Sequence, residues 1–414
     1  MQPHTTPVHH RASEFKAVCL LALGLGMVGL DRFIINPLFP VMQKELGLSY
    51  QDLGVISAAL ALTWGAASIV SGRLADRLGP SRVLIAAMAA FSLLAATTGL
   101  ATGLASLLVI RSVMGLAEGA YVPASIVATV NASKPSRVGL NIGLQQMAQP
   151  LVGLGLGPII AISLLKVLPS WHYVFAAVAV PGLLLAAVMA RVLRDPARIA
   201  GTPRDDAHEW RTVATNGAVR VNTATMLCYL TCVIPLSTFM PSYLTDYLRL
   251  NLDQMGMVLT GQGAGSLIGM VVIPALSDRF GRKPLLIAAL LAELVALWMF
   301  RTIGAEPIKL FSALFVIAFM NSGAIAITVG PLTSAAVPPR LAASATGLVV
   351  GVGEIVGGAM APAVTGALAH AMGIAVIPVV ALIAIAMGTA IVAFGVREPT
   401  LLADIEEHPV STRP

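Results

Sequence analysis

The chain has 414 residues, of which 57% are hydrophobic and only 11% are charged. Its mean hydropathy of +0.85 excludes an ordinary water-soluble globular protein. The formal net charge of +6 comes without a cluster of basic residues interleaved with aromatics, so we expect no nucleic-acid partner.

Apolar segments long enough to cross a bilayer recur about twelve times along the chain. Within lipid only helices and closed barrels satisfy every backbone hydrogen bond, and the strands of a barrel would be shorter and would alternate in polarity. The sequence therefore predicts an all-α membrane protein with twelve transmembrane helices. They lie near residues 16–38, 52–72, 83–102, 105–128, 139–166, 172–192, 222–245, 255–276, 285–302, 308–333, 341–369 and 373–395.

The polar ends of the spans give the expected orientation in the membrane. Residues 1–15 have no apolar core, and no small-residue cleavage site follows the first span, so we expect no removed signal peptide. With the amino terminus inside, nineteen lysines and arginines fall on the cytoplasmic side and five on the other. The positive-inside rule thus predicts a multi-pass membrane protein with both termini in the cytoplasm. We expect its membrane to be a plasma membrane, specifically a bacterial inner membrane.

The residue patterns of enzymes and metal proteins are missing from the sequence. Cys19, Cys228 and Cys232 lie in or beside apolar spans without the spacing of metal ligands. The sequence has no metal-ligand cluster, no nucleophile with a nearby base and no phosphate-binding glycine loop. We therefore expect no enzyme, no metal and no bound cofactor.

Charged residues interrupt two of the apolar spans. Asp31 and Arg32 lie in the first span, and Arg111 and Glu118 lie in the fourth, within RSVMGLAEGAYVPA. An ionised group at the centre of a bilayer costs about 2.5–3.5 kcal/mol on insertion scales, so such residues are candidates for function. Arg111 and Glu118 are seven positions apart, about two helical turns, and therefore share one face of their helix.

A loop sequence occurs once in each half of the chain. GRLADRLGPSR occupies residues 72–82, and PALSDRFGRKP occupies residues 274–284. A shift of 202 residues, about half the chain, places Asp76 on Asp278. A repeat of two six-span halves with a substrate site between them near the bilayer midplane is the plan of many secondary transporters.

This loop resembles the motif G-x-L-A-D-R-x-G-R-[RK] of the major facilitator superfamily. The resemblance implies two pseudo-symmetric six-helix bundles at 16–192 and 222–395, cytoplasmic tails at 1–15 and 396–414, and a cytoplasmic linker at 193–221. It also implies that the motif acts as a cytoplasmic gate that latches the two halves, whereas the alternative is that its bases only anchor the loops. The first copy departs from the motif at Pro80 and Ser81. The matching residues are Gly72, Leu74, Ala75, Asp76, Arg77 and Gly79 in the first copy and Asp278, Arg279, Gly281, Arg282 and Lys283 in the second.

The charged residues of the spans resemble those of the anion:cation symporter group, which includes bacterial sugar-acid transporters and sialin-like relatives. The pattern R-x-x-x-G-x-x-E-G-x-x-x-P-A begins at Arg111, and the first span adds the Asp31-Arg32 pair. The resemblance implies that Asp31 and Glu118 carry protons and that Arg32 and Arg111 bind a substrate carboxylate. The alternative is a static network in which Asp31 pairs with Arg111 or Arg32. The two glycines of the pattern, which leave room for a neighbouring helix, are Gly115 and Gly119.

Further polar side chains in the spans are candidates for the substrate site. Each could equally bond a neighbouring helix, because polar residues are common interhelical contacts in membranes. The second half has no lysine or arginine in the middle of its spans, which favours a carboxylate or a sugar acid over a phosphate. These candidates are Tyr121, Gln145, Gln262, Asn321 and Glu354.

We therefore expect a monomeric secondary transporter that moves a small organic anion by proton-coupled symport with alternating access. Its partners are the anion, protons as the coupling ion, and the lipid bilayer. The alternative is a proton-coupled antiporter that exports drugs or metabolites, because Gly153, Gly157 and Pro158 resemble the G-x-x-x-G-P of such antiporters. Ala161 and Ile162 replace the two glycines that follow in that motif, which weakens this alternative.

Overall fold

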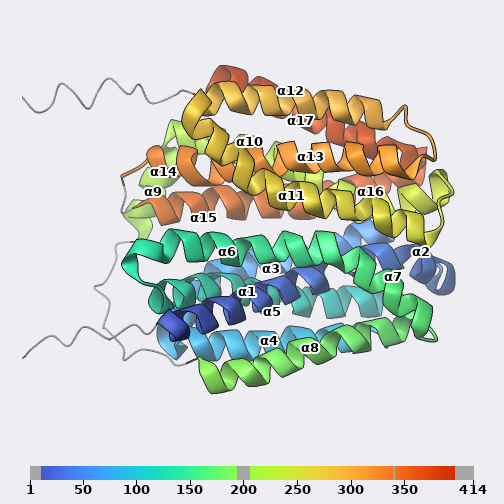
Figure 1. Cartoon of the computed structure of the whole chain (residues 1–414), viewed down its shortest axis with the longest axis horizontal. Coiled ribbons are helices and arrows are strands. Elements are labelled where there is room, and N and C mark those ends of the chain that lie inside the picture. Colours follow the sequence, from blue (N-terminus) through green and yellow to red (C-terminus); the bar gives the residue numbers. More distant parts are fainter. Residues whose placement is uncertain (1–10, 194–205, 339–340, 397–414) are drawn as a thin grey trace, which may run out of the picture.

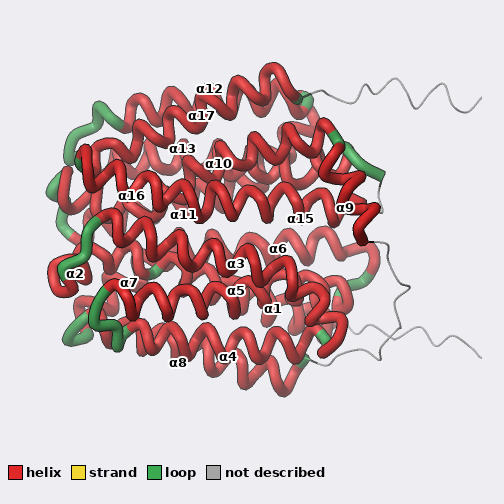
Figure 2. Tube along the Cα trace, turned by 180° about the vertical axis from the view of Figure 1, so that it is seen from behind, coloured by secondary structure: helices red, strands yellow, loops and turns green. Residues whose placement is uncertain are grey.

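The computed structural model describes residues 11–193, 206–338 and 341–396, and every regular element among them is helical (Figure 2). The first half of the chain forms α1 (Arg11–Phe33), α2 (Ile35–Leu46), α3 (Tyr50–Leu78), α4 (Pro80–Thr98), α5 (Leu104–Ala132), α6 (Val138–Pro150), α7 (Gly157–Val167) and α8 (Trp171–Val192). The second half forms α9 (Asp206–Thr215), α10 (Gly217–Ser242), α11 (Leu252–Phe280), α12 (Arg282–Phe300), α13 (Pro307–Ile327), α14 (Thr333–Ala335), α15 (Ala342–Gly353), α16 (Ala361–Met372) and α17 (Ile377–Gly395).

The helices form two bundles that follow the two halves of the sequence. Helices α1–α8 lie together in blue to green, and α10–α17 lie together in yellow-green to red (Figure 1). Eleven helical segments of the described residues are long and apolar enough to cross a membrane. Helix α3 packs along α5 and α16 and takes the place of the remaining predicted span. The predicted fold of twelve transmembrane helices in two six-helix bundles is confirmed.

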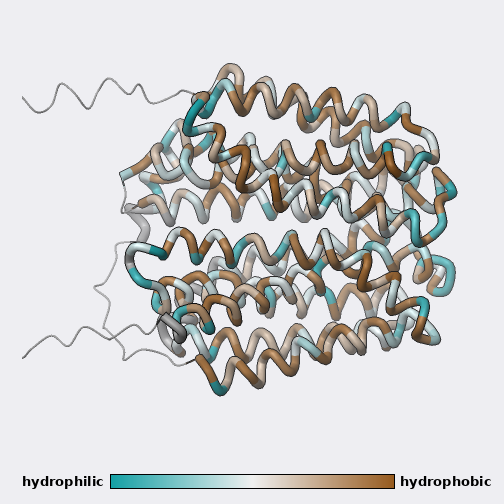
Figure 3. Tube along the Cα trace, viewed as in Figure 1, coloured by the Kyte–Doolittle hydropathy of each residue, from teal (hydrophilic) through white to brown (hydrophobic). Residues whose placement is uncertain are grey.

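The two ends of the bundles can be told apart by the chain ends and loops that lie there. The described chain begins at Arg11 and ends at Val396 at the same end of the helices, which we call the terminal face (Figure 1). Loops such as 47–49 and 248–251 lie at the other end, which we call the opposite face. Hydrophobic residues dominate the helices, and hydrophilic residues gather near both ends (Figure 3). This distribution is that of a multi-pass membrane protein.

Several predicted spans are not single regular helices. The first span is divided at Ile34, between α1 and α2, where Pro37 cannot donate to the carbonyl of Phe33. Single π-helical turns interrupt four others, and such turns occur frequently at functional sites. The hydropathy pattern predicts a continuous helix in each case and gives no sign of these turns. They are η2 (Leu151–Leu156), η3 (Tyr243–Tyr247), η4 (Thr328–Leu332) and η6 (Glu354–Met360).

The repeat seen in the sequence is also a repeat of backbone conformation. Gly79 ends α3 with φ 93° and ψ 137°, and Gly281 ends α11 with φ 86° and ψ 147°. Residues with a Cβ atom rarely adopt a positive φ, so glycine is required at both positions. The 202-residue shift therefore relates two turns of the same geometry, each of which joins a long helix to the next one.

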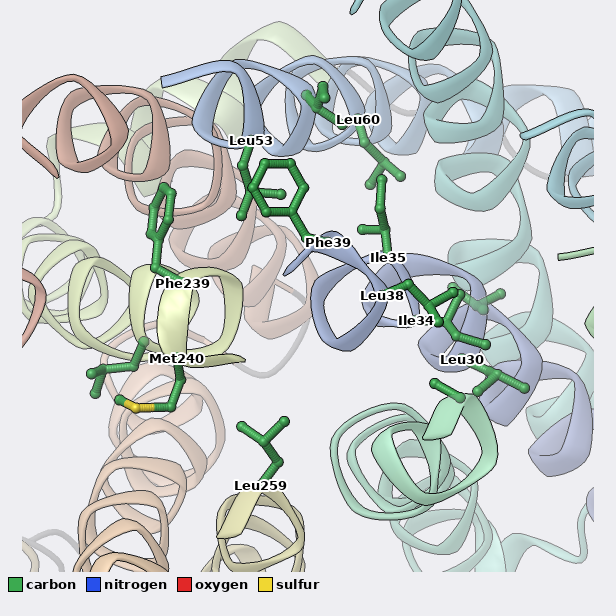
Figure 4. Packing of buried hydrophobic residues seen from close by; sticks show 14 of the residues in the cluster. Leu30, Ile34, Ile35, Leu38, Phe39, Leu53, Leu60, Phe239, Met240 and Leu259 are labelled. Atoms are coloured by element: carbon green, nitrogen blue, oxygen red, sulfur yellow. The ribbon is translucent and has the colours of Figure 1, made fainter. Parts of the chain in front are cut away.

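One buried hydrophobic cluster reaches across both bundles. It includes Leu30 and Phe39 from the first span, Leu53 from α3, and Phe239 from α10. Phe39 lies next to Leu53 in Figure 4. Within the first bundle α5 packs closely on α3. Gly119 allows this approach, since an added Cβ there would collide with the backbone of α3.

Candidate functional site

Two helices of the first bundle bring four buried charged residues into one region. Asp31 and Arg32 lie on α1, and Arg111 and Glu118 lie on α5. At most 9% of the surface of any of the four is exposed, and Glu118 is completely buried. Coulombic interactions connect Glu118 with Arg32 and Arg111. The structure thus brings together the four residues on which the sequence placed the site.

A small cavity of about 20 Å³, measured as the space open to the centre of a water molecule, lies beside both arginines, between the two bundles. Arg32 and Arg111 are its only charged lining residues among those the structure describes. Its wall is mostly apolar, with a few polar groups, as is usual for small-molecule sites. The remaining lining residues are Phe33, Ile35, Asn36, Ile56, Ser57, Leu60, Ile234, Thr238 and Gly358.

Arg111, one of the lining residues, has unused hydrogen-bond donors. Its Nη1 donates to the backbone carbonyl of Asp31 at 3.0 Å and to that of Arg32 at 3.4 Å. Its Nε and Nη2 are buried and have no hydrogen-bond partner. The carbonyls hold the guanidinium in place while leaving two donors on one side of the fork. Such a pair of donors matches the two oxygens of a carboxylate.

The two buried acids have no hydrogen-bond partner. Neither carboxylate oxygen of Asp31 or of Glu118 is hydrogen-bonded, and all four oxygens are buried. An ionised carboxylate in such a position carries a large desolvation cost, whereas a protonated one carries much less. In this structure Asp31 therefore has no hydrogen-bonded pairing with Arg111 or Arg32, and Arg111 contacts the first span through backbone carbonyls instead.

Arg32 reaches the second bundle instead. Its Nη2 lies 2.7 Å from Oε2 of Glu354, the first residue of η6. Its guanidinium carbon also lies 5.5 Å from the ring centroid of Trp64 on α3. Glu354, a candidate from the sequence, therefore contacts one of the two cavity arginines. The pair crosses from one bundle to the other.

Glu354 and the other candidate substrate residues do not line the cavity themselves. Tyr121 is buried in the first bundle, where its ring meets Phe91 edge to face. The remaining three are bonded within their own bundles, and their part in substrate binding stays a prediction. Gln145 accepts a hydrogen bond from Thr129, Gln262 donates to Ser237, and Asn321 donates to Glu293.

The loop motif lies at the terminal face. In its second copy Asp278 and Arg279 are exposed, and Arg282 donates to the carbonyl of Pro331 at 3.0 Å. In the first copy the side chains of Asp76 and Arg77, after Gly72, lie outside the described part of the chain. The role of the motif as a gate stays a prediction.

Polar contacts between the bundles run from the cavity to the opposite face. Together with the Arg32–Glu354 pair, they hold the bundles against each other on that side. Among the residues whose contacts are described, three further pairs join the bundles: Asn36 with the carbonyl of Ser237, Tyr50 with Asp246, and Lys166 with Asp253.

Two residues near the site escaped sequence reasoning. Ser57 lines the cavity and Trp64 contacts Arg32, and both belong to α3. They are seven positions apart and therefore share a helix face. This spacing is the signal that could have found them, but residues 53–72 of the second span carry no charge to draw attention to that face.

Comparisons with known proteins agree with this architecture. The hexuronate transporter of Bacillus subtilis is 26% identical over 73% of this chain and 71% of its own length. A probable 4-methylmuconolactone transporter of Cupriavidus pinatubonensis is 26% identical over 81% of this chain and 79% of its own. A bacterial homolog of the human lysosomal transporter Spinster, solved in an inward-facing and unoccupied conformation, has a TM-score of 0.78. It is 15% identical and covers 92% of this chain and 97% of its own, which shows the shared fold alone.

Family assignment rests on both halves of the sequence. Residues 21–247 and 223–412 each match the Major Facilitator Superfamily. The two matches together extend over nearly the whole chain, in keeping with its two bundles. The chain therefore belongs to the Major Facilitator Superfamily.

Proposed function

We propose that the protein carries a small organic anion, a carboxylate or a sugar acid, together with protons across a bacterial inner membrane. The observation that carries this proposal is Arg111, whose buried Nε and Nη2 have no partner beside a cavity between the bundles. The names of two relatives, a hexuronate transporter and a probable 4-methylmuconolactone transporter, support an organic substrate of this size. Both termini lie in the cytoplasm, as the positive-inside rule predicts.

The anion binds first to the free side of Arg111. Two guanidinium donors meet the two oxygens of one carboxylate, which a lysine could not do with the same geometry. Hydroxyl groups of a sugar acid bond to Asn36, Ser57 and Thr238, which line the same cavity. The apolar remainder of the wall excludes water and strengthens the charge interaction.

Asp31 and Glu118 take up and release the protons. Both carboxyl groups are buried without a donor, so their protonation removes a large desolvation cost. Ionisation becomes favourable when a rearrangement brings water or an arginine to them. Each conformation thus has its own proton affinity, and proton binding shifts the balance between the two conformations.

Alternating access follows from the position of the contacts between the bundles. Those contacts run from the cavity to the opposite face, as the Tyr50–Asp246 hydrogen bond illustrates. With the terminal face in the cytoplasm, this state is closed toward the outside. Transport requires the contacts to open while the terminal face closes, through movement of one bundle against the other.

Uptake into proteoliposomes tests the proposal, with D-glucuronate as the probe. An inward proton gradient is expected to drive its accumulation. Accumulation that only an outward gradient drives contradicts symport and favours the exporter alternative. The variants Asp31→Asn and Glu118→Gln are expected to abolish gradient-driven uptake while sparing exchange of D-glucuronate for D-glucuronate. Glu306→Gln, at an exposed carboxylate paired with Lys309, serves as the control.

A further inference from the structure

Glu354 holds a position that the transport scheme leaves unexplained. It is an acid from the second bundle placed against an arginine of the proposed anion site, with 2.7 Å between Oε2 and Arg32 Nη2. Only 12% of its side chain is exposed. The negative charge of this side chain opposes anion binding, so its place beside an anion site needs an explanation.

The backbone around Glu354 is suited to holding the carboxylate there. Glu354 begins the π-helical turn η6, and Gly358 lies one turn further along and lines the cavity. A Cβ atom at position 358 would collide with Oε2 of Glu354. Glycine therefore leaves the space in which the carboxylate reaches Arg32.

The charged residues near the cavity come from three of the elements packed around it. Helix α1 supplies Asp31 and Arg32, α5 supplies Arg111 and Glu118, and η6 supplies Glu354. The lining residues from α2, α3 and α10 are uncharged. Glu293, the other buried acid of the second bundle, is bonded to Asn321 and Cys232 and has no contact with either cavity arginine among the described hydrogen bonds and ion pairs.

We propose that Glu354 limits the transported anion to a single negative charge. This inference rests on the proposed function, because it takes Asp31 and Glu118 as protonated in the loaded state. Two arginines and one ionised glutamate then leave one positive charge, which a monoanion neutralises. A dianion would leave an uncompensated negative charge in an apolar site, and that is costly. Glu354 balances the charge of Arg32 within the protein, and Arg111 binds the substrate.

Size-matched pairs of anions test this inference. D-gluconate and D-glucarate differ chiefly in one carboxylate, and so do hexanoate and adipate. The wild-type protein is expected to bind and transport the monoanion of a pair and to exclude the dianion. In Glu354→Gln the ratio of dianion to monoanion binding is expected to rise at least about tenfold. Ligand-induced thermal stabilisation reports binding, and proteoliposome uptake reports transport.

Two control variants, Glu354→Asp and Glu306→Gln, separate the effect of the lost charge from a general disturbance of the protein by substitution. Glu354→Asp keeps the charge on a shorter side chain and is expected to keep the exclusion of dianions. Glu306→Gln removes an exposed carboxylate and is expected to behave as wild type. A wild-type protein that carries both members of a pair equally, or a Glu354→Gln protein that still excludes dianions, overturns the inference while leaving the proposed function intact. A wild-type protein that binds no monoanion overturns the proposed function and the inference with it.

Discussion

Tyr50 of α3 donates a hydrogen bond of 2.8 Å to Oδ2 of Asp246 in η3, and this bond joins the two bundles at the opposite face. Tyr50→Phe removes the donor and keeps the ring. The contact contributes about 1 kcal/mol, so the state closed at this face should lose about fivefold in population against the open state.

Spin labels on the opposite face measure this change. Lys44→Cys and Asn251→Cys carry the labels, because both residues border the surface basin between the bundles. In Tyr50→Phe the distance distribution between the labels should gain a longer component. Tyr247→Phe, at an exposed tyrosine, is the matched control. An unchanged distribution in Tyr50→Phe would show that the bond does not hold the bundles together.

Arg111→Lys tests the shape of the anion site separately from its charge. The lysine keeps the positive charge but loses the fork that bonds two backbone carbonyls and leaves Nε and Nη2 free. Binding of D-glucuronate should weaken by about tenfold or more, measured by ligand-induced thermal stabilisation. Arg301→Lys, an exposed arginine at the opposite face, should bind as wild type does. Wild-type affinity in Arg111→Lys would mean that the substrate does not meet this fork.

Gly119→Ala tests the close approach of α5 to α3. The added Cβ would collide with the carbonyl of Trp64, which is backbone and cannot turn aside. The helices must separate, at a cost of about 1–3 kcal/mol in the free energy of unfolding. Gly143→Ala is the matched control, because that glycine is also helical and a Cβ there meets nothing within 4 Å. Thermal unfolding in detergent should show a lower midpoint for Gly119→Ala only.

Hydropathy and the doubled loop motif were enough to predict the architecture. Apolar length decides where a chain crosses a bilayer, and the shift between Asp76 and Asp278 divides it into two halves. Burial of charge is costly anywhere in the membrane, so the four charged residues of the first and fourth spans stand out in the sequence alone.

Contacts between residues of different bundles could not be predicted from the sequence in the same way. Arg32 and Glu354 are 322 positions apart, and their contact depends on how the two bundles meet. The η6 turn that begins at Glu354 leaves no mark in the hydropathy pattern. Tyr121 shows the converse limit. Its side of α5 packs on Phe91 of α4 in the bundle core, and the sequence of a single helix does not reveal which of its faces lines the cavity.

Gly358→Ala separates the position of Glu354 from its charge. The added Cβ would meet Oε2 of Glu354, which is the far end of a flexible side chain, so the carboxylate can turn away and the protein should still fold. Arg32 is then free while the negative charge stays nearby. Monoanions such as D-gluconate should bind several-fold more tightly, because they no longer compete with Glu354 for Arg32. Dianions should remain excluded, since the count of charges is unchanged.

Gly351→Ala is the control for this variant, because a Cβ at that helical glycine meets nothing within 4 Å. Competition between D-gluconate and D-glucarate, followed by thermal stabilisation, gives both affinities in one experiment. Admission of D-glucarate by Gly358→Ala would mean that the Arg32–Glu354 contact, and not the number of charges, selects the substrate. Unchanged affinity for D-gluconate would mean that Glu354 does not compete with the anion, and that Arg32 serves to join the bundles.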